Sequence, residues 1–251
     1  MNMARTSRTF LLLLLTVLSV TAFSQRTYLN NRLLLERISN SNNLVTGTTG
    51  MVAGLPQPPA GVVGDAFLKN YFCNGALLLF EGDQVVGGYD IKYDIQKDDF
   101  YLRKDRVIRV LEGSKVKNVL LVDSLTKTQL QFINGILLKD ESGAPFLGFF
   151  EVLRDGKTAL LKRTEIEIKA PDFHPALNVG SKDHRVVKHT KLFASIDGVV
   201  RPIPTGKKVI QLFPGQEEAM MKFIKTNKLD AKSESHLKGI FEHYEKLTSG
   251  K

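Results

Sequence analysis

Four aspartates lie close together in the sequence, and paired carboxylates are the groups that calcium binding and glycoside hydrolysis both use. They are Asp90, Asp94, Asp98 and Asp99, and the first two project from the same face of a predicted strand. The spacing is not that of a calcium-binding helix–loop–helix. Nothing in the sequence sets two carboxylates at the separation that glycoside hydrolysis needs. We therefore expect a solvated strand face and a polar turn.

The histidines do not have the spacing of a zinc site, which needs three or four ligands around one metal. His184 and His189 are five residues apart, so in a strand they face opposite sides. His236 and His243 share a helix face, but about 10 Å of helical rise separates them. With a single cysteine in the chain, the sequence predicts no metal site and no bound cofactor.

The common catalytic motifs are absent. The chain contains no G-x-S-x-G, H-E-x-x-H or C-x-x-C pattern and no dinucleotide-binding glycine pattern. The segment 204–208, PTGKK, resembles a phosphate-binding loop but lacks the upstream glycine and the following Ser or Thr. Ser195 is expected in a strand before a hairpin, and Cys73 is expected to be buried beside Phe72. No catalytic residue is predicted.

Aromatic residues are the remaining candidates for ligand contacts. The chain has 15 Phe, 6 Tyr and no Trp, and Phe146, Phe149 and Phe150 lie almost together. Aromatic side chains interleaved with basic residues can stack on bases or sugar rings. The simpler expectation is that they fill the core of a sheet.

The start of the chain has the pattern of a secretory signal peptide. Arg5 and Arg8 precede an apolar run over 9–23, and Ala22 and Ser24 supply small residues before Gln25. A positive start, a short apolar core and a small-residue cleavage site predict export and removal of residues 1–24. The apolar run is shorter than a membrane-spanning helix requires. No cysteine lies near the predicted cleavage site, so a lipid anchor is not expected. We expect the protein in the periplasm or cell envelope, or outside the cell.

The positive charge of the chain is concentrated in its second half. Residues 25–150 carry 14 Lys and Arg against 13 Asp and Glu, whereas residues 151–251 carry 19 against 13, a net charge of +6. A basic surface attracts polyanions. For an exported protein the expected partner is an anionic envelope surface or another envelope protein, not nucleic acid. The alternative is an ordinary solvated surface, and the oligomeric state stays open.

With 251 residues, 43% hydrophobic and 24% charged, the chain has the composition of one or two globular domains. Prolines and glycines make residues 25–64 a predicted flexible arm. From residue 65 the signal is that of strands. Polar and apolar residues alternate over 89–96 and 163–169, and Asp155-Gly156 and Asp197-Gly198 predict hairpins. Pro214-Gly215 is expected to end the last strand.

The fold class predicted is mainly β, α+β overall. An antiparallel sheet over 65–213 is expected to curl into a barrel, roll or sandwich. The segment KAPDFHPALNVGSKDH, residues 169–184, is expected to be a surface loop followed by a strand from about Arg185. Apolar residues at helical spacing over 219–224 and 237–247 predict two short helices in 214–251, packed on the sheet or on each other.

Several stretches carry a resemblance to a known family. They are GALLLFEGDQVVGGYDIKYD, GFFEVLRDGKTALLKR, KLFASIDGVVRPIPTGKKVIQLFPG and MMKFIKTNKLDAKSESHLKGIFEHYEKL. Over roughly residues 65–247 the chain resembles an uncharacterised family of exported Gram-negative bacterial proteins. The resemblance implies export and a strand-rich domain followed by a helical pair. It carries over no activity, cofactor or functional residue.

The sequence therefore predicts a soluble envelope protein that binds or scaffolds and has no enzymatic activity. The first alternative is a hydrolase of an envelope polymer, with a site assembled from scattered Asp, Glu and His. The second is an assembly subunit that donates or accepts a strand, which an uncovered sheet edge would favour.

Overall fold

The computed structural model describes residues 54–57 and 59–249. The predicted signal peptide and most of the predicted arm lie outside the described residues. The strands are β1 (Val62–Val63), β2 (Cys73–Leu79), β3 (Val85–Asp94), β4 (Asp99–Lys104), β5 (Val107–Glu112), β6 (Val116–Val122), β7 (Gln129–Asn134), β8 (Phe149–Arg154), β9 (Thr158–Lys169), β10 (His184–Ile196) and β11 (Val199–Pro202). The α-helices are α3 (Glu217–Thr226) and α4 (Glu234–Ser249), and four short 3₁₀ helices are η1 (Glu81–Asp83), η2 (Gly113–Lys115), η3 (Gly135–Leu137) and η4 (Gly206–Leu212).

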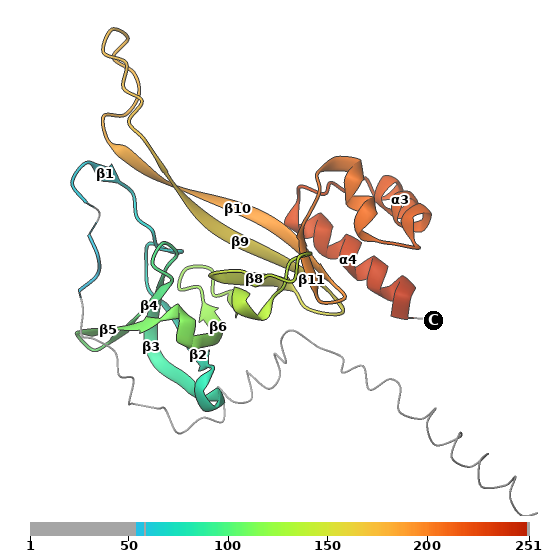
Figure 1. Cartoon of the computed structure of the whole chain (residues 1–251), viewed down its shortest axis with the longest axis horizontal. Helices are drawn as coiled ribbons and strands as arrows, with labels where there is room; N and C mark the ends of the chain where they lie inside the picture. The colour runs from blue at the N-terminus through green and yellow to red at the C-terminus, as the bar shows by residue number, and fades with distance from the viewer. Residues whose placement is uncertain (1–53, 58, 250–251) are drawn as a thin grey trace, which may run out of the picture.

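The strands form one large, mostly antiparallel sheet, and the helices follow it at the C-terminal end (Figure 1). The strand order is β1-β10-β9-β8-β7-β6-β2-β3-β4-β5, with β11 paired to β10. Among the strands that the structure describes, only β1 runs parallel to its neighbour, β10. The prediction of a mainly β fold with C-terminal helices is confirmed.

The predicted curling into a barrel, roll or sandwich is wrong, because the sheet is neither closed nor curled. Among the described strands, β5 pairs only with β4 at one end of the order. At the other end β10 pairs with β1 and β11 and not with β5. The C-terminal helices cover apolar residues of β9 and β10 that a closing strand or a second sheet would otherwise cover.

The local signals place most strands and turns correctly. Asp197 and Gly198 both have positive φ, at 51° and 84°, which is the backbone of a tight hairpin between β10 and β11. Asp155-Gly156 connects β8 to β9 as predicted. The prediction that the last strand ends at Pro214 is wrong: β11 ends at Pro202. The residues after it form η4, which buries Val209 and Leu212 in the core.

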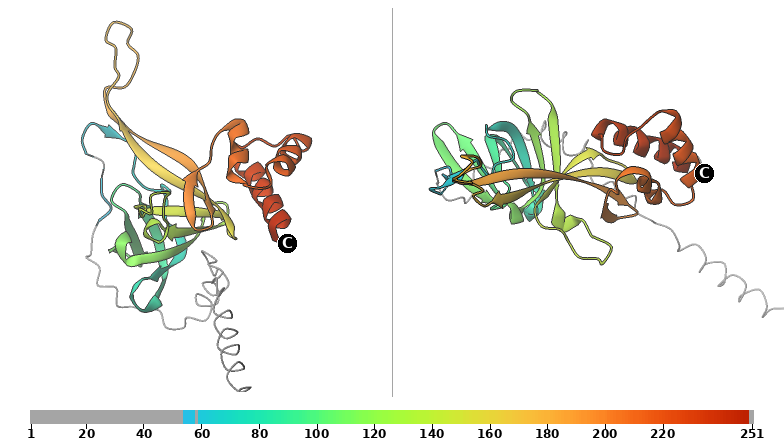
Figure 2. Two further views of the ribbon diagram at one scale, coloured as in Figure 1. Left: turned by 45° about the vertical axis from the view of Figure 1, so that its right-hand side comes forward. Right: turned by 90° about the horizontal axis from the view of Figure 1, so that it is seen from above.

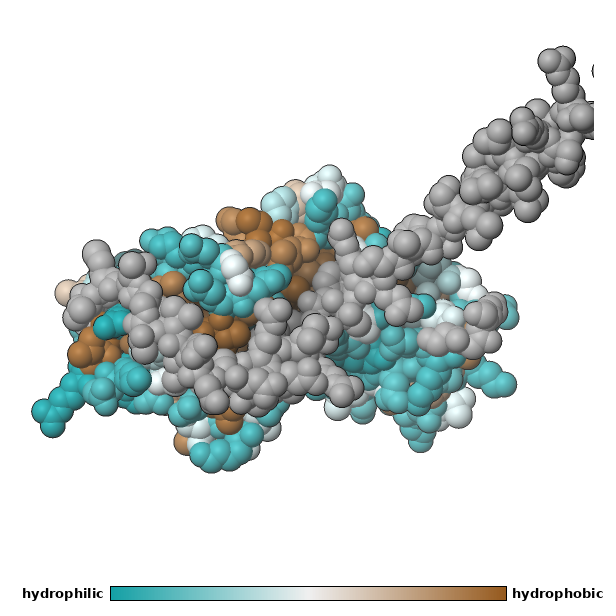
Figure 3. Space-filling model, turned by 90° about the horizontal axis from the view of Figure 1, so that it is seen from below, coloured by the Kyte–Doolittle hydropathy of each residue, from teal (hydrophilic) through white to brown (hydrophobic). Residues whose placement is uncertain are grey.

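The hydrophobic core has two large regions and a smaller one, in which Phe150 of β8 meets Leu161 of β9 and Phe193 of β10. The first lies among β2 to β8 and brings together side chains far apart in the strand order, including Phe100 of β4 against Phe149 of β8 at 5.1 Å between ring centroids. The second lies between the sheet and the helices, where Leu160 and Ala194 meet Phe241 of α4. The outward faces of the helical end are mostly hydrophilic (Figure 3). The helices are therefore packed on the sheet through one apolar face each.

The hairpin of β9 and β10 is the longest element, and its far end projects beyond the rest of the fold (Figures 1 and 2). Twelve consecutive residue pairs join the two strands, from Thr158 with Ile196 to Lys169 with Arg185. Its near half is buried between the core regions, whereas its far half carries mostly charged and polar side chains. The predicted surface loop at 170–183 forms the tip.

The helical pair should unfold together with the sheet. Phe241 is fully buried in the core shared by α4, η4 and β9, so Phe241→Ala should lower the free energy of unfolding by about 3–5 kcal/mol. Glu242→Ala, one residue along on the exposed side of α4, should cost less than about 0.5 kcal/mol. Urea denaturation followed by circular dichroism measures both. Loss of the helical signal while the sheet stays folded would contradict a shared core.

Candidate functional site

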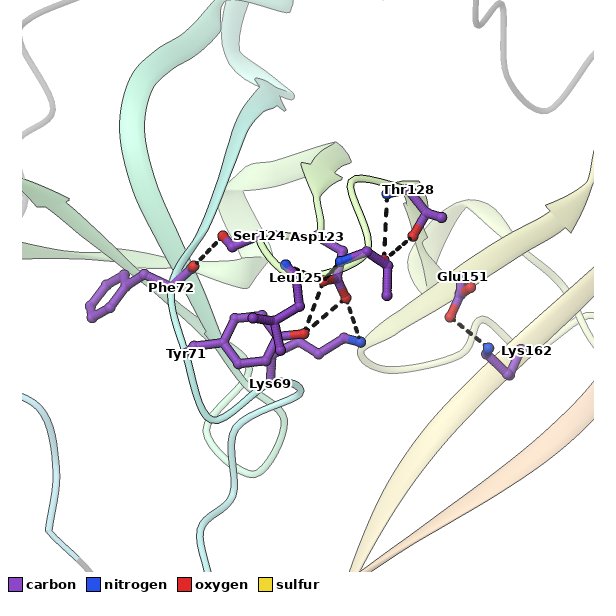
Figure 4. Close-up of polar contacts among 10 residues, drawn as sticks. Lys69, Tyr71, Phe72, Asp123, Ser124, Leu125, Thr128, Glu151 and Lys162 are labelled. Atoms are coloured by element: carbon purple, nitrogen blue, oxygen red, sulfur yellow. Dashed lines mark hydrogen bonds and ion pairs between the residues drawn. The ribbon is translucent and has the colours of Figure 1, made fainter.

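The most densely bonded polar group in the described chain is Asp123, which is buried at the end of β6 (Figure 4). The Lys69 ammonium lies 2.8 Å from its Oδ2, and the Tyr71 hydroxyl donates to the carboxylate at 2.9 Å. Both residues come from the segment that leads into β2. The cluster therefore joins two parts of the chain about fifty residues apart.

The Asp123 carboxylate also accepts backbone hydrogen bonds from the β6–β7 turn that follows it. Its Oδ1 accepts the backbone N–H of Leu125 at 2.9 Å and of Thr126 at 3.0 Å. The hydrogen bond from Lys69 and these backbone donors hold the pKa of Asp123 far below its usual range. A carboxylate that is ionised and fully hydrogen-bonded is a poor base. The cluster of Lys69, Tyr71 and Asp123, which we call the Asp123 clasp, therefore has a structural role: it joins the segment before β2 to the β6–β7 turn.

The aspartates that the sequence analysis considered for calcium or hydrolysis do not form a site. Asp90 pairs with Arg103 of β4 at 2.9 Å. Asp98 accepts the buried Tyr93 hydroxyl at 2.8 Å, and burial raises the pKa of Asp98. Within residues 54–57 and 59–249, no group of three or more His, Cys, Asp or Glu is placed to hold a metal ion. The expected solvated strand face and polar turn describe Asp90 well, whereas Asp94 is buried.

The histidines are held by separate structural contacts. His184 and His189 lie on β10, where an odd spacing puts them on opposite faces as predicted. His189 contacts Glu167 of β9 at 2.6 Å. On α4, His236 accepts the backbone N–H of Asp230 through Nδ1, and His243 stacks on Phe223 with ring centroids 3.8 Å apart.

The other candidate residues also lie where packing explains them. Cys73 is buried, and burial raises the pKa of its thiol, so the thiol stays protonated. Ser195 is fully buried within β10, as expected for a strand residue. Phe149 and Phe150 are core residues, and Phe146 packs edge-on against Phe150, which confirms that these aromatics fill the core.

The surface that sequence reasoning did not single out is the tip of the β9–β10 hairpin, residues 170–183. Every residue of this segment is exposed except Phe173 and Ser181, which are partly buried. Leu177 and Val179 are 68% and 56% exposed. Isolated exposed apolar residues are common, but here two of them occupy the outermost turn of a projecting element.

The tip has a defined conformation. Asp172 accepts the backbone N–H of Ser181 at 2.7 Å and pairs with Arg185 at 2.8 Å, which closes the base of the loop. His174 pairs with Val179 through the backbone, and the Lys182 ammonium lies 4.6 Å from the centre of the Phe173 ring. Over 169–191 the hairpin carries five Lys and Arg against two Asp. The result is an ordered basic loop that presents two apolar side chains.

Comparison with family models, with curated proteins and with solved structures finds no significant match. The resemblance to exported Gram-negative proteins therefore remains a prediction. In the described chain, no helix is both long enough and apolar enough to cross a membrane.

The Asp123 clasp should contribute to stability in a pH-dependent way. A carboxylate whose pKa is lower in the folded than in the unfolded chain stabilises the fold above its unfolded pKa of about 3.8, and this contribution fades as the pH falls. Asp123→Ala should therefore lower the denaturation midpoint strongly at pH 7 and progressively less below pH 4. Asp105→Asn is the control, because it removes an exposed charge from the β4–β5 turn and keeps a side chain that tolerates the positive φ of 57° there. Equal losses at pH 7 and pH 3 would contradict the electrostatic account.

Proposed function

We propose that the protein is an exported cell-envelope protein that works by binding, and that the β9–β10 tip contacts an anionic envelope surface. The tip carries this proposal, because it is the most exposed segment and combines apolar side chains with positive charge. Apolar residues at the end of a projecting hairpin can enter the headgroup region of a lipid surface. Lysines beside them add electrostatic attraction to anionic lipid.

The sequence supports the same proposal. The signal-peptide pattern predicts export, and residues 151–251, which contain the hairpin, hold nearly all of the net positive charge of residues 25–251. Lys169 and Lys182 have no acidic partner within hydrogen-bonding distance among the described residues. Their charges are therefore available to a polyanion.

Vesicle binding tests the contact directly. The protein without residues 1–24 should sediment with phosphatidylglycerol-containing vesicles and not with phosphatidylcholine vesicles. Lys169→Gln and Lys182→Gln should each weaken binding about fivefold at low salt, from ~1 kcal/mol per lysine near the surface. The double change Leu177→Ser with Val179→Ser should weaken binding at all salt concentrations, because it removes the apolar contribution.

Leu147→Ser is the matched control, since Leu147 is 83% exposed but lies in the loop before β8. It should leave binding unchanged. Equal sedimentation with both kinds of vesicle, or equal loss from Leu147→Ser, would contradict the proposal. If the protein does not bind vesicles but residue 177 crosslinks to another envelope protein in cells, the partner of the tip is a protein and not a lipid surface.

One observation favours the assembly-subunit alternative as a second candidate. The strand β5 pairs only with β4 among the described strands, so one edge of the sheet is open there. If that edge accepts a strand from a second copy, the protein should elute as a concentration-dependent dimer in size-exclusion chromatography. Val107→Lys, at an exposed position of β5, should then favour the monomer. A monomer at all concentrations would count against self-assembly through β5.

A further inference from the structure

A cavity of about 530 Å³ lies between residues 56, 57 and 59–67, the C-terminal end of β3 and the far half of the β9–β10 hairpin. This volume is within the range of small-molecule sites in proteins. The described residues that line it are Pro56, Gln57, Pro59, Val62, Gly64, Asp65, Ala66, Phe67, Asp94, Gln96, Lys97, Ile168 and Val186.

The walls of the cavity are held by backbone pairing on two sides. On one side Val62 and Val63 of β1 pair with His184 and Arg185 of β10. On the other side Leu68 donates its N–H to Tyr93 at 2.9 Å. The segment between these points spans the gap from β10 to β3. The part of the cavity wall formed by residues 62–68 is therefore tied to the sheet at both ends.

The anchoring on β10 is close and includes an ion pair. A Cβ built on Gly64 would lie 3.2 Å from the Cβ of Val186, so the segment runs directly over the strand. The Asp65 carboxylate lies 3.2 Å from the Lys188 ammonium and also accepts the backbone N–H of Phe67. The charge of Asp65 is thus already balanced from within the protein.

The lining is mostly apolar. Val62 and Phe67 face the cavity from the segment before β2, and Ile168 and Val186 face it from β9 and β10. Ile168 is 48% exposed although it sits on the otherwise charged far half of the hairpin. An apolar body inside the cavity would cover this side chain, which nothing else in the described chain covers fully.

Asp94 is the polar group that sets the chemistry of the cavity. It is only 2% exposed, and its Oδ1 accepts the backbone N–H groups of Gln96 and Lys97 at 3.0 and 3.1 Å. No described residue makes a hydrogen bond or ion pair to its Oδ2. A carboxylate that is largely removed from water and has an unpaired oxygen gains from a cationic partner. Gln96 and Lys97 also line the cavity, but both are exposed and lie at its rim.

We propose that this cavity binds a small organic amine with an apolar body, with the ammonium group at Asp94 Oδ2 and the apolar part against Phe67, Ile168 and Val186. The cation supplies the partner that Asp94 Oδ2 lacks among the described residues, and the apolar part packs against the apolar walls. This ligand site is separate from the hairpin tip and does not depend on the proposed envelope contact.

Three probes of equal chain length separate the two parts of the proposal: n-octylamine, octan-1-ol and octanoate, each titrated calorimetrically into the purified protein at pH 7. Octylamine should bind about tenfold to a hundredfold more tightly than octanol, because a charge-assisted hydrogen bond replaces a neutral one. Octanoate should bind most weakly, because its carboxylate repels Asp94.

Asp94→Asn is the decisive variant, because the amide oxygen can keep both backbone hydrogen bonds of Oδ1 while the negative charge is lost. It should reduce octylamine affinity to that of octanol and change octanol affinity less than twofold. Asp105→Asn removes an exposed carboxylate and should change neither. Ile168→Trp should fill the cavity and weaken both probes.

The proposal is overturned if wild-type protein binds octylamine no more tightly than octanol, or if it binds none of the probes. It is equally overturned if Asp94→Asn keeps the preference for the amine, or if Asp105→Asn loses it. None of these outcomes depends on whether the hairpin tip binds vesicles.

Discussion

The unbroken register between β9 and β10 is the constraint on which the rest of the structure depends. Cross-strand pairs alternate between the two faces, so Leu160 and Ala194 meet the helices while Leu161 and Phe193 pack on the opposite side. A shift of the register by one residue would exchange these faces. The core under the helices and the smaller core on the opposite face would then both lose their contacts with the hairpin, because the strands are buried on both sides at this end.

The same register fixes where the C-terminal helices lie. Two short helices are marginal on their own, so their position comes from the face of β9 and β10 that they cover. Ion pairs then hold α4 at two points along its length: Glu245 pairs with Arg154 of β8, and Glu234 pairs with Lys162 of β9. Hydrophobic burial thus places the helix, and the ion pairs set its position along the hairpin.

The aspartates of this protein are mostly used to build turns. Asp123, Asp140 and Asp172 each accept backbone N–H groups of the loop that follows them, and each has its pKa lowered by such hydrogen bonds together with side-chain partners. This use explains why a search for catalytic carboxylates found no motif. Asp94 begins the same kind of turn but is only 2% exposed, and its second oxygen has no partner among the described residues.

Local patterns predict most of the elements, because the determinants are short-range. The alternation over 89–96 and 163–169, the Asp-Gly turns and the helical spacing over 219–224 and 237–247 all correspond to elements of the structure. What the sequence could not supply is the long-range pairing. Neither the position of β2 between β3 and β6 nor the parallel pairing of β1 has a local signature, so the open sheet was mistaken for a curled one.

The candidate sites were missed for the same reason. Leu177 and Val179 are unremarkable in sequence, and they matter only because the hairpin carries them beyond the rest of the fold. Asp94 was noticed as one of four acidic residues, but its burial follows from pairing between residues 66–68 and 93–95, which lie about 27 residues apart. Both the hairpin tip and the cavity depend on how the strands pair over long distances in the sequence, and neither has a local motif.

The far half of the hairpin also needs support that its own sequence provides only weakly. Its cross-strand side-chain contacts, such as the ion pair of Glu165 with Lys191 and the hydrogen bond of Glu167 with His189, lie at the surface, and surface ion pairs contribute about 0–1 kcal/mol each. A two-stranded hairpin without other contacts is marginal in water. The segment with β1 and Asp65 braces it from the side. The wall of the cavity and the support of the projecting tip are therefore the same piece of chain.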